Sequence, residues 1–488
     1  MRRAGRLRQL ADRTPATRER YVDLLRVVAI AMVVLGHWTV TVIGYDAAGR
    51  PTGRSALPDL PWAYPLTWLV QVMPVFFLVG GFANAASLTA HRRRGGAPTD
   101  WLLDRAARLL RPTTALLLTL TAAAAVAWIR DIGADQIRTV VWFATIPLWF
   151  LSAYLAVVAL APVMYPLHRR FGLAVPLVLV ALVAAGDLAR FAGAGGLAAG
   201  SYLFGWLAVH QVGFAWHDGR LRPGPRTGLP LLAGGSTALL LLTVVGPYPV
   251  VMLAVPGARL DNASPPSLAL LAVATAQLGL ILALRDPAER WLHRRRPWLV
   301  VIAVNAVVLT IFLWHLSATV LLVGVLDALH LLPTPPVGTA AWFAWRLPWL
   351  LLLSLVLAGP VAVFGPVEAR AARRRPPGDT PGSLHGTPGA PGDTANRPGD
   401  TARGPHPGPV RAALTVVAFA AALAGLLINS MTPKAAPEPL GVPVAALAVY
   451  LAGAAVLRLL RSGRPGSRSV AAGPAGAGPV SSGSGNRG

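Results

Sequence analysis

Long runs of hydrophobic residues recur along almost the whole chain, separated by short polar segments. Runs of about 18 or more apolar residues are typical of helices that span a lipid bilayer. We count about twelve such runs, at 21–45, 62–90, 112–129, 139–165, 171–190, 197–216, 228–247, 266–284, 298–326, 342–366, 411–429 and 441–460. The pattern predicts an all-α polytopic integral membrane protein with about twelve transmembrane helices.

One long polar stretch interrupts this pattern. Residues 367–410 are rich in Pro, Gly, Thr and Arg and contain repeats of PGDT, so they cannot bury a core and are expected to form a disordered cytoplasmic linker. The linker separates a ten-helix unit, 21–366, from a two-helix membrane hairpin, 411–460, whose spans carry charge only at Arg411 and Arg458, near their linker-side and tail-side ends, and which is expected at the periphery. The basic tail 1–20 and the Gly/Ser/Pro-rich tail 461–488 are expected to be cytoplasmic, the second one disordered.

The charge distribution predicts how the chain sits in the membrane. Of the 44 Lys and Arg residues, most fall in cytoplasmic segments if the N-terminus is cytoplasmic, as the positive-inside rule requires. We therefore expect a multi-pass plasma-membrane protein with both termini cytoplasmic. Anionic lipid headgroups or an anionic donor explain the net charge of +24 better than nucleic acid, which is not expected as a partner.

The absence of cysteine excludes disulfides, thiolate metal sites and a cysteine nucleophile. There is no HExxH pattern, and nothing else in the sequence predicts a metal site.

The first apolar segment carries three ionisable residues, Asp23, Arg26 and His37. Such residues are costly inside a membrane and mark a functional site by default. On a helix, Arg26 and His37 fall within about 20° of each other, and Asp23 can pair with Arg26 one turn away. One face of this helix therefore presents a carboxylate, a guanidinium and an imidazole.

Four segments together resemble membrane acyltransferase family 3, whose members acylate sugars, polysaccharides and macrolides. They are RxYVDLLRVVAIAMVVLGH in the first helix, MPVFFLVGGF, LWFLSAYL and the late FLWHLS, and the resemblance covers about residues 18–366. Gly80 is a departure, because the family usually has serine there and the hydroxyl is absent.

The resemblance implies transfer of an acyl group from cytoplasmic acyl-CoA to a hydroxyl of a carbohydrate, glycolipid or secondary metabolite. It implies His37 as the catalytic histidine, Arg26 as its essential partner, and no tightly bound cofactor. Histidine suits the role of general base because its pKa lies near the working pH. Direct transfer in a ternary complex is favoured, and an acyl-His37 intermediate stays open.

Depth along the helix separates the roles. From Tyr21, Arg26 lies about 7 Å into the membrane and His37 about 24 Å. We therefore expect Arg26, oriented by Asp23, to grip the CoA end of the donor, and His37 to meet the thioester more deeply. His315 lies at similar depth in its own helix and is expected to line the acceptor side. A set of arginines at i, i+3 and i+6 suits the nucleotide phosphates of the donor: Arg105, Arg108 and Arg111.

Several supporting residues carry weaker expectations. Asn84 is a plausible polar lining residue, whereas Trp149, Ser152 and Tyr154 indicate helix packing more than chemistry. The histidines near the predicted cytoplasmic boundary are interpreted as loop or interface residues: His91, His168, His210, His217 and His293.

The chief rival function is a transporter or flippase, and the second is a family member that has lost activity. A transporter is disfavoured because the chain shows no six-plus-six repeat and no matching pair of broken helices.

Overall fold

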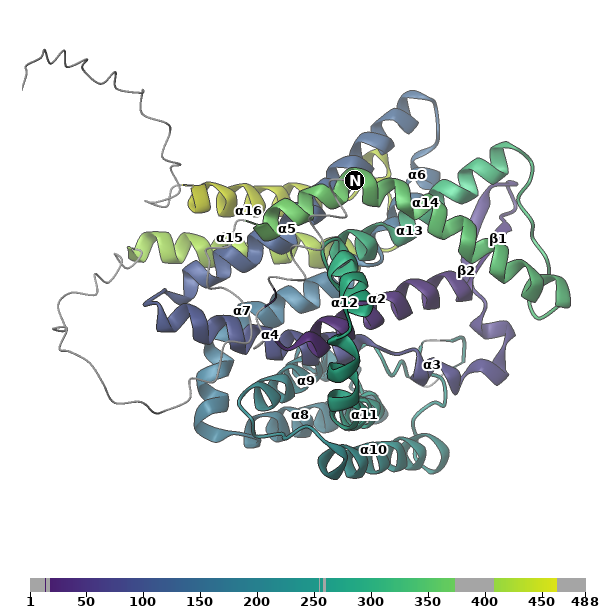
Figure 1. Ribbon diagram of the computed structural model, residues 1–488. Coiled ribbons are helices and arrows are strands. Elements are labelled where there is room, and N and C mark those ends of the chain that lie inside the picture. The colour runs from purple at the N-terminus through teal and green to yellow at the C-terminus, as the bar shows by residue number, and fades with distance from the viewer. Residues whose placement is uncertain (1–13, 15–17, 254, 258–259, 374–407, 463–488) are drawn as a thin grey trace, which may run out of the picture.

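The computed structural model describes residues 14, 18–253, 255–257, 260–373 and 408–462, and most of this part of the chain is helical (Figure 1). The α-helices are α2 (Arg20–Val40), α3 (Leu66–Leu69), α4 (Met73–Arg93), α5 (Pro98–Ile129), α6 (Ala134–Thr145), α7 (Leu148–Phe171), α8 (Ala174–Phe191), α9 (Ser201–His217), α10 (Pro225–Leu240), α11 (Leu268–Leu292), α12 (Arg295–Asn305), α13 (Val308–Ala328), α14 (Ala340–Arg373), α15 (Pro409–Met431) and α16 (Val444–Ser462). The remaining elements are strands β1 (Thr41–Tyr45) and β2 (Pro51–Ser55), the short 3₁₀ helices η1 (Leu57–Asp59), η2 (Pro61–Ala63), η3 (Gly195–Gly200) and η5 (Pro439–Gly441), and the π-helical segment η4 (Leu241–Val245).

Within the described residues, eleven helices are long and apolar enough to cross a membrane. The predicted all-α polytopic fold is thereby confirmed. One predicted span, 197–216, is not among these eleven. It is formed by η3 and α9, and α9 has only 17 residues. Most of its residues are buried, because α9 packs against α4, α7 and α8.

Three predicted spans are interrupted. The segment 139–165 is split into α6 and α7 at Pro147, which lacks an N–H and cannot continue the hydrogen bonding of α6. The segment 298–326 is split into α12 and α13 at Ala306 and Val307. The segment 62–90 contains η2 and α3 before α4 begins at Met73. Hydrophobicity alone does not reveal such breaks, because residues on both sides of each break are apolar.

The first predicted span, 21–45, is helical only to Val40. Residues 41–45 form β1, which pairs antiparallel with β2, and β-branched residues at this point favour a strand. Between the strands, hydrogen bonds from the backbone N–H groups of Arg50 and Ala48 hold the pKa of the Asp46 carboxyl below its usual value. The Arg50 guanidinium also donates to Asp135 at 2.8 Å and so connects this β-hairpin to α6.

Two predicted boundaries are wrong. Helix α5 begins at Pro98 rather than at 112, so the arginines at 105, 108 and 111 lie within a helix. Helix α14 continues to Arg373, so the first residues assigned to the linker are helical. Residues 374–407 of the predicted linker, the C-terminal tail from 463 and most of the N-terminal tail lie outside the described residues, and the last two residues assigned to the linker, 409 and 410, begin α15.

The C-terminal hairpin α15–α16 packs on the outside of the bundle against α5 and α7 (Figure 1). The Tyr450 hydroxyl donates to Leu110 O at 3.0 Å and lies 2.9 Å from Thr114 Oγ1. Closer to the start of α5, Arg461 pairs with Asp104 at 3.2 Å. The hairpin is therefore peripheral but fixed to the long helix α5 at several points.

Candidate active site

The structure places His37 directly against His315. His37 lies in the last turn of α2 and His315 two turns into α13. His37 Nδ1 is 2.8 Å from His315 Nε2, and the two rings are parallel within 6°. His315 is fully buried, whereas His37 keeps part of its surface accessible. The two histidines are thus in contact although a break separates α12 from α13.

The hydrogen bonds of this pair determine which nitrogen is basic. His315 Nδ1 lies 2.5 Å from the Phe312 carbonyl oxygen, which can only accept, so this nitrogen carries the proton. In a neutral imidazole the other nitrogen, Nε2, then holds a lone pair and accepts from His37 Nδ1–H. The remaining nitrogen of His37, Nε2, is therefore left as the basic one. A general base requires such an unprotonated nitrogen.

The backbone around the pair is fixed by its neighbours. Trp38 donates its indole N–H to His315 O at 3.0 Å, and the Thr41 hydroxyl donates to His37 O at 2.6 Å. Trp38 is buried, so its hydrogen bond ties α2 to α13 beside the histidines. The two rings are thus held by their own helices and by a direct link between those helices.

The four sequence segments converge on this pair through a chain of aromatic contacts. Phe76 and Phe77 of α4 contact Phe150 of α7, with ring centroids 5.3 and 5.6 Å apart. Phe150 lies 5.3 Å from Phe312, which in turn lies 6.0 Å from the His315 ring. Segments far apart in the sequence therefore form one cluster behind the histidines.

Gly80 makes room for Tyr154. A Cβ on Gly80 would lie 2.7 Å from Tyr154 Cε2 and 3.1 Å from its hydroxyl oxygen. The tyrosine thus brings a hydroxyl to the place from which a serine side chain would have projected. The other two supporting residues of α7 make local contacts: the Ser152 hydroxyl donates to Trp149 O at 2.7 Å, and the Trp149 ring contacts Phe150 and Tyr202.

Arg26 and Asp23 lie near the other end of α2. Arg26 Nη1 is 3.5 Å from Asp23 Oδ1, as the i, i+3 spacing predicts, and a third of the Arg26 side chain is exposed. Arg18 donates to Asp23 Oδ2 at 2.7 Å, and Asn305 donates to Asp23 O at 2.9 Å. Along the helix Arg26 is about 16 Å from His37, so the two cannot act on one reacting atom.

The three arginines of α5 do not share one environment. Arg105 donates to Ala83 O at 2.9 Å and to the Ser87 hydroxyl, and its guanidinium lies 5.3 Å from the centre of the Trp101 ring. It therefore joins α5 to α4. Arg108 and Arg111 are partly exposed on the same helix, and the binding of donor phosphates by these arginines stays a prediction.

Asn84 belongs to a second buried polar pair. Its side-chain nitrogen lies 3.0 Å from Nε2 of His210 on α9, and neither residue is exposed. The interpretation of His210 as a loop or interface residue was therefore wrong, and so was that of His168, because both are fully buried side chains of helices. The signal in the sequence was the mainly apolar segment around His210, with only Gln211 beside it, which indicates a helix buried on most sides. Glycines allow this contact, because a Cβ on Gly81 would overlap the His210 carbonyl oxygen.

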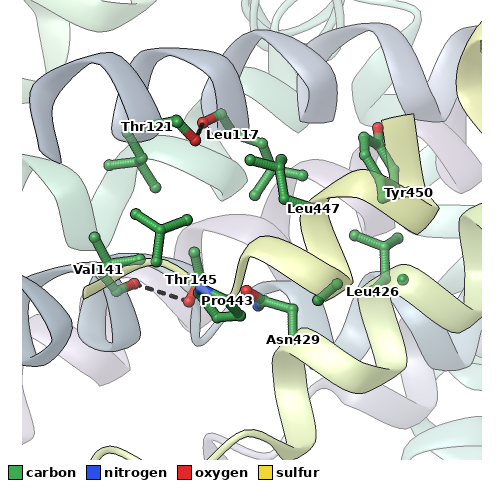
Figure 2. Close-up of a pocket in the computed structure, with 13 residues that line it drawn as sticks. Leu117, Thr121, Val141, Thr145, Leu426, Asn429, Pro443, Leu447 and Tyr450 are labelled. Atoms are coloured by element: carbon green, nitrogen blue, oxygen red, sulfur yellow. Dashed lines mark hydrogen bonds between the residues drawn. The ribbon is translucent and has the colours of Figure 1, made fainter. Parts of the chain in front are cut away.

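A cavity lies away from the histidines, between the C-terminal hairpin and helices α5 and α6 (Figure 2). Its volume is about 20 Å³, which is room for one water molecule. Its walls are mainly apolar, with Thr121, Thr145 and Asn429 as the polar members. The two threonine hydroxyls donate to carbonyls of their own helices at 2.8 Å. This cavity belongs to the hairpin interface and does not extend the histidine site.

Comparison with known proteins identifies one family. The family model described as "Acyltransferase domain" matches residues 19–365, well over half of the chain. The match contains α2 to α13 and most of α14, and hence both histidines, and it leaves the C-terminal hairpin outside. Comparisons with curated proteins and with solved structures returned no match.

Proposed function

The chain belongs to the membrane acyltransferase 3 family and is an acyltransferase enzyme, and from this premise we propose that it moves an acetyl or other short acyl group from acyl-CoA to an acceptor hydroxyl with His37 as the general base. The acceptor class is a carbohydrate, a glycolipid or a secondary metabolite. The observation that supports the proposal best is the hydrogen-bonded pair of His37 and His315, which leaves His37 Nε2 as the basic nitrogen.

The proposed reaction balances with these groups alone. His37 Nε2 accepts the proton of the acceptor hydroxyl while its oxygen attacks the thioester carbonyl carbon. The tetrahedral intermediate then breaks its C–S bond, and the proton on His37 passes to the departing CoA sulfur. The products are the acyl ester and free CoA. His315 acts by accepting the His37 Nδ1–H, which stabilises the imidazolium formed in between.

Opposite ends of α2 suit the two substrates. Arg26, beside Asp23, lies near the start of α2 and offers a cationic group to the CoA end of the donor. His37 lies close to the other end, where β1 begins. If the N-terminus is cytoplasmic, the donor enters at Arg26 and an acceptor on the far side of the membrane reaches His37.

The first test compares membranes that contain the wild type, His37→Ala or His293→Ala, supplied with radiolabelled acetyl-CoA and an extract of envelope and small-molecule acceptors. Loss of a general base lowers rates by about 10²- to 10⁴-fold. We therefore expect a labelled product with the wild type and with the His293 variant, whose histidine is exposed just after the end of α11, and almost none with His37→Ala.

Other outcomes distinguish the alternatives. Equal labelling by His37→Ala would overturn the assignment of the base. Label that stays on the denatured protein would indicate an acyl-His37 intermediate instead of direct transfer. No product from the folded wild type with a panel of acyl-CoAs would favour a family member that has lost activity.

A further inference from the structure

Helix α14 makes polar contacts with both histidine-bearing helices, at positions near its two ends. We propose that α14 is the element that sets the His37–His315 contact, with Glu368, Arg346 and Trp349 as positioning residues. The proposal rests on the proposed function, since it assigns these residues an effect on that reaction. Glu368 lies beyond the family match.

Glu368 caps the helix that carries His315. The break between α12 and α13 leaves the first N–H groups of α13 without partners in their own helix, and Val307 at the cap position offers no side-chain acceptor. Glu368 supplies two of the missing acceptors: Oε1 accepts from Leu309 N at 3.0 Å and Oε2 from Thr310 N at 2.8 Å. Oε2 also accepts the Thr310 hydroxyl at 2.7 Å. A carboxylate also suits the positive end of the helix dipole.

The same carboxylate is also attracted by a cation of α2, because Arg26 acts on Glu368 electrostatically. Glu368 is therefore hydrogen-bonded to the start of α13 and lies in the field of Arg26.

Arg346 and Trp349 hold the end of α2 that carries His37. The last carbonyls of a helix lack partners in that helix and favour a nearby cation. Arg346 donates to Thr41 O at 3.0 Å, and Trp349 donates its indole N–H to Trp38 O at 3.0 Å. The Arg346 guanidinium is itself kept in place by the Trp342 ring, 4.6 Å from its centre. These contacts fix the residues that directly follow His37 at the end of α2.

The contacts close a triangle of three helices. Trp349 of α14 donates to Trp38 O of α2, and Trp38 donates to His315 O of α13. Glu368 of α14 accepts from Thr310 N of α13, which completes the triangle. A shift of α13 along α2 must break at least one of these hydrogen bonds. A misplacement of about 1 Å at a reacting group can cost about 10²-fold in rate, and the 2.8 Å contact between the histidines has little tolerance for such a shift.

The test uses the full-length protein and Glu368→Gln, which keeps the size of the side chain but replaces one acceptor oxygen with a donor. The matched controls are Glu368→Asp, which keeps the charge, and Val363→Ala on the exposed side of the same helix. Radiolabelled acetyl-CoA at varied concentration, with a fixed acceptor extract, gives the maximal rate and the apparent KM. Because the chain has no cysteine, spin labels at Leu35→Cys and Leu321→Cys, both exposed, report the distance between α2 and α13.

For Glu368→Gln we expect a maximal rate lower by about tenfold to 10²-fold, an unchanged apparent KM for acetyl-CoA, and a broadened or shifted α2–α13 distance. Glu368→Asp should recover part of the rate, and Val363→Ala should match the wild type. A wild-type rate in folded Glu368→Gln, or a loss confined to KM, would overturn the proposal. If the wild type transfers no acyl group at all, the proposed function fails, and an unchanged α2–α13 distance in Glu368→Gln would then overturn the positioning role separately.

Discussion

At the scale of single residues, Gly80 shows how a departure from a motif can be compensated in space. The sequence indicates only that a serine hydroxyl is missing. The structure shows the Tyr154 ring in the space that a larger residue would need, with its hydroxyl beside the same backbone. Gly80 and Tyr154 therefore form a matched pair, although they lie on different helices.

This pairing predicts the effect of Gly80→Ala. The added methyl group would lie 2.7 Å from the Tyr154 ring, and such overpacking typically costs about 1–3 kcal/mol. We expect a lower midpoint of thermal unfolding in detergent for Gly80→Ala. In a Tyr154→Ala background, where the ring is gone, the same substitution should have little effect. An equal cost in both backgrounds would show that the ring does not restrict position 80.

Site residues could be predicted from the sequence where the evidence for them lies within one segment, and not where it depends on contacts between distant segments. His37, Arg26 and Asp23 stand out because charged and polar residues are rare in an apolar span, and helical spacing put them on one face. The contact between His37 and His315 joins residues 278 positions apart, and no periodicity encodes it. Glu368 was assigned to the linker, because a charge at the end of an apolar run resembles the end of a span.

At the scale of elements, the sequence predicted where helices lie better than where they break. Length and hydrophobicity define a span because a bilayer requires a minimum number of apolar residues. Residues at a break inside an apolar run are themselves apolar, so the breaks before α7 and α13 do not lower the local hydropathy. Of the two breaks, only the one before α7 has a sequence signal, which is Pro147. The break before α13 matters for function, since it creates the helix start that Glu368 caps.

The C-terminal hairpin offers a test at this scale. Arg138 of α6 is buried and donates to Thr432 O at 2.7 Å and Pro433 O at 3.0 Å, in the turn between α15 and α16. Arg138→Ala leaves these carbonyls without their donor, and each buried unpaired group costs about 1–3 kcal/mol. We expect faster hydrogen exchange in residues 432–443 and a lower unfolding midpoint.

Arg138→Lys is the matched variant, because it keeps the charge and loses the planar fork that binds two carbonyls at once. It should lie between the wild type and Arg138→Ala. Unchanged exchange in both variants would mean that the hairpin is held by its helix contacts alone.

At the scale of the whole molecule, the positive-inside rule predicts an orientation that the absence of cysteine makes easy to measure. Ala48, in the turn of the β-hairpin, and Arg222, between α9 and α10, are both exposed and should lie on opposite sides of the membrane. With a membrane-impermeant maleimide on intact cells, we expect labelling of Ala48→Cys and not of Arg222→Cys. The reverse pattern would invert the topology and place the donor side at His37.

The architecture as a whole was predictable because the bilayer permits few alternatives. Backbone polar groups must be satisfied within each span, so long apolar runs become helices. How these helices pack depends on contacts that composition does not describe, such as the glycines between α4 and α9 or the polar residues along α14. The class of protein therefore follows from the sequence, and the shape of the site requires the structure.

The most direct test of the histidine pair is a double-mutant cycle on acetyl transfer, measured with wild type, His37→Ala, His315→Ala and the double variant at equal amounts of folded protein. Residues that act as one unit give strongly non-additive losses. We expect each single variant to lose activity and the double variant to be no slower than His37→Ala within about threefold. A wild-type rate for His315→Ala, or a double variant that loses the product of the two single effects, would contradict the proposed pair.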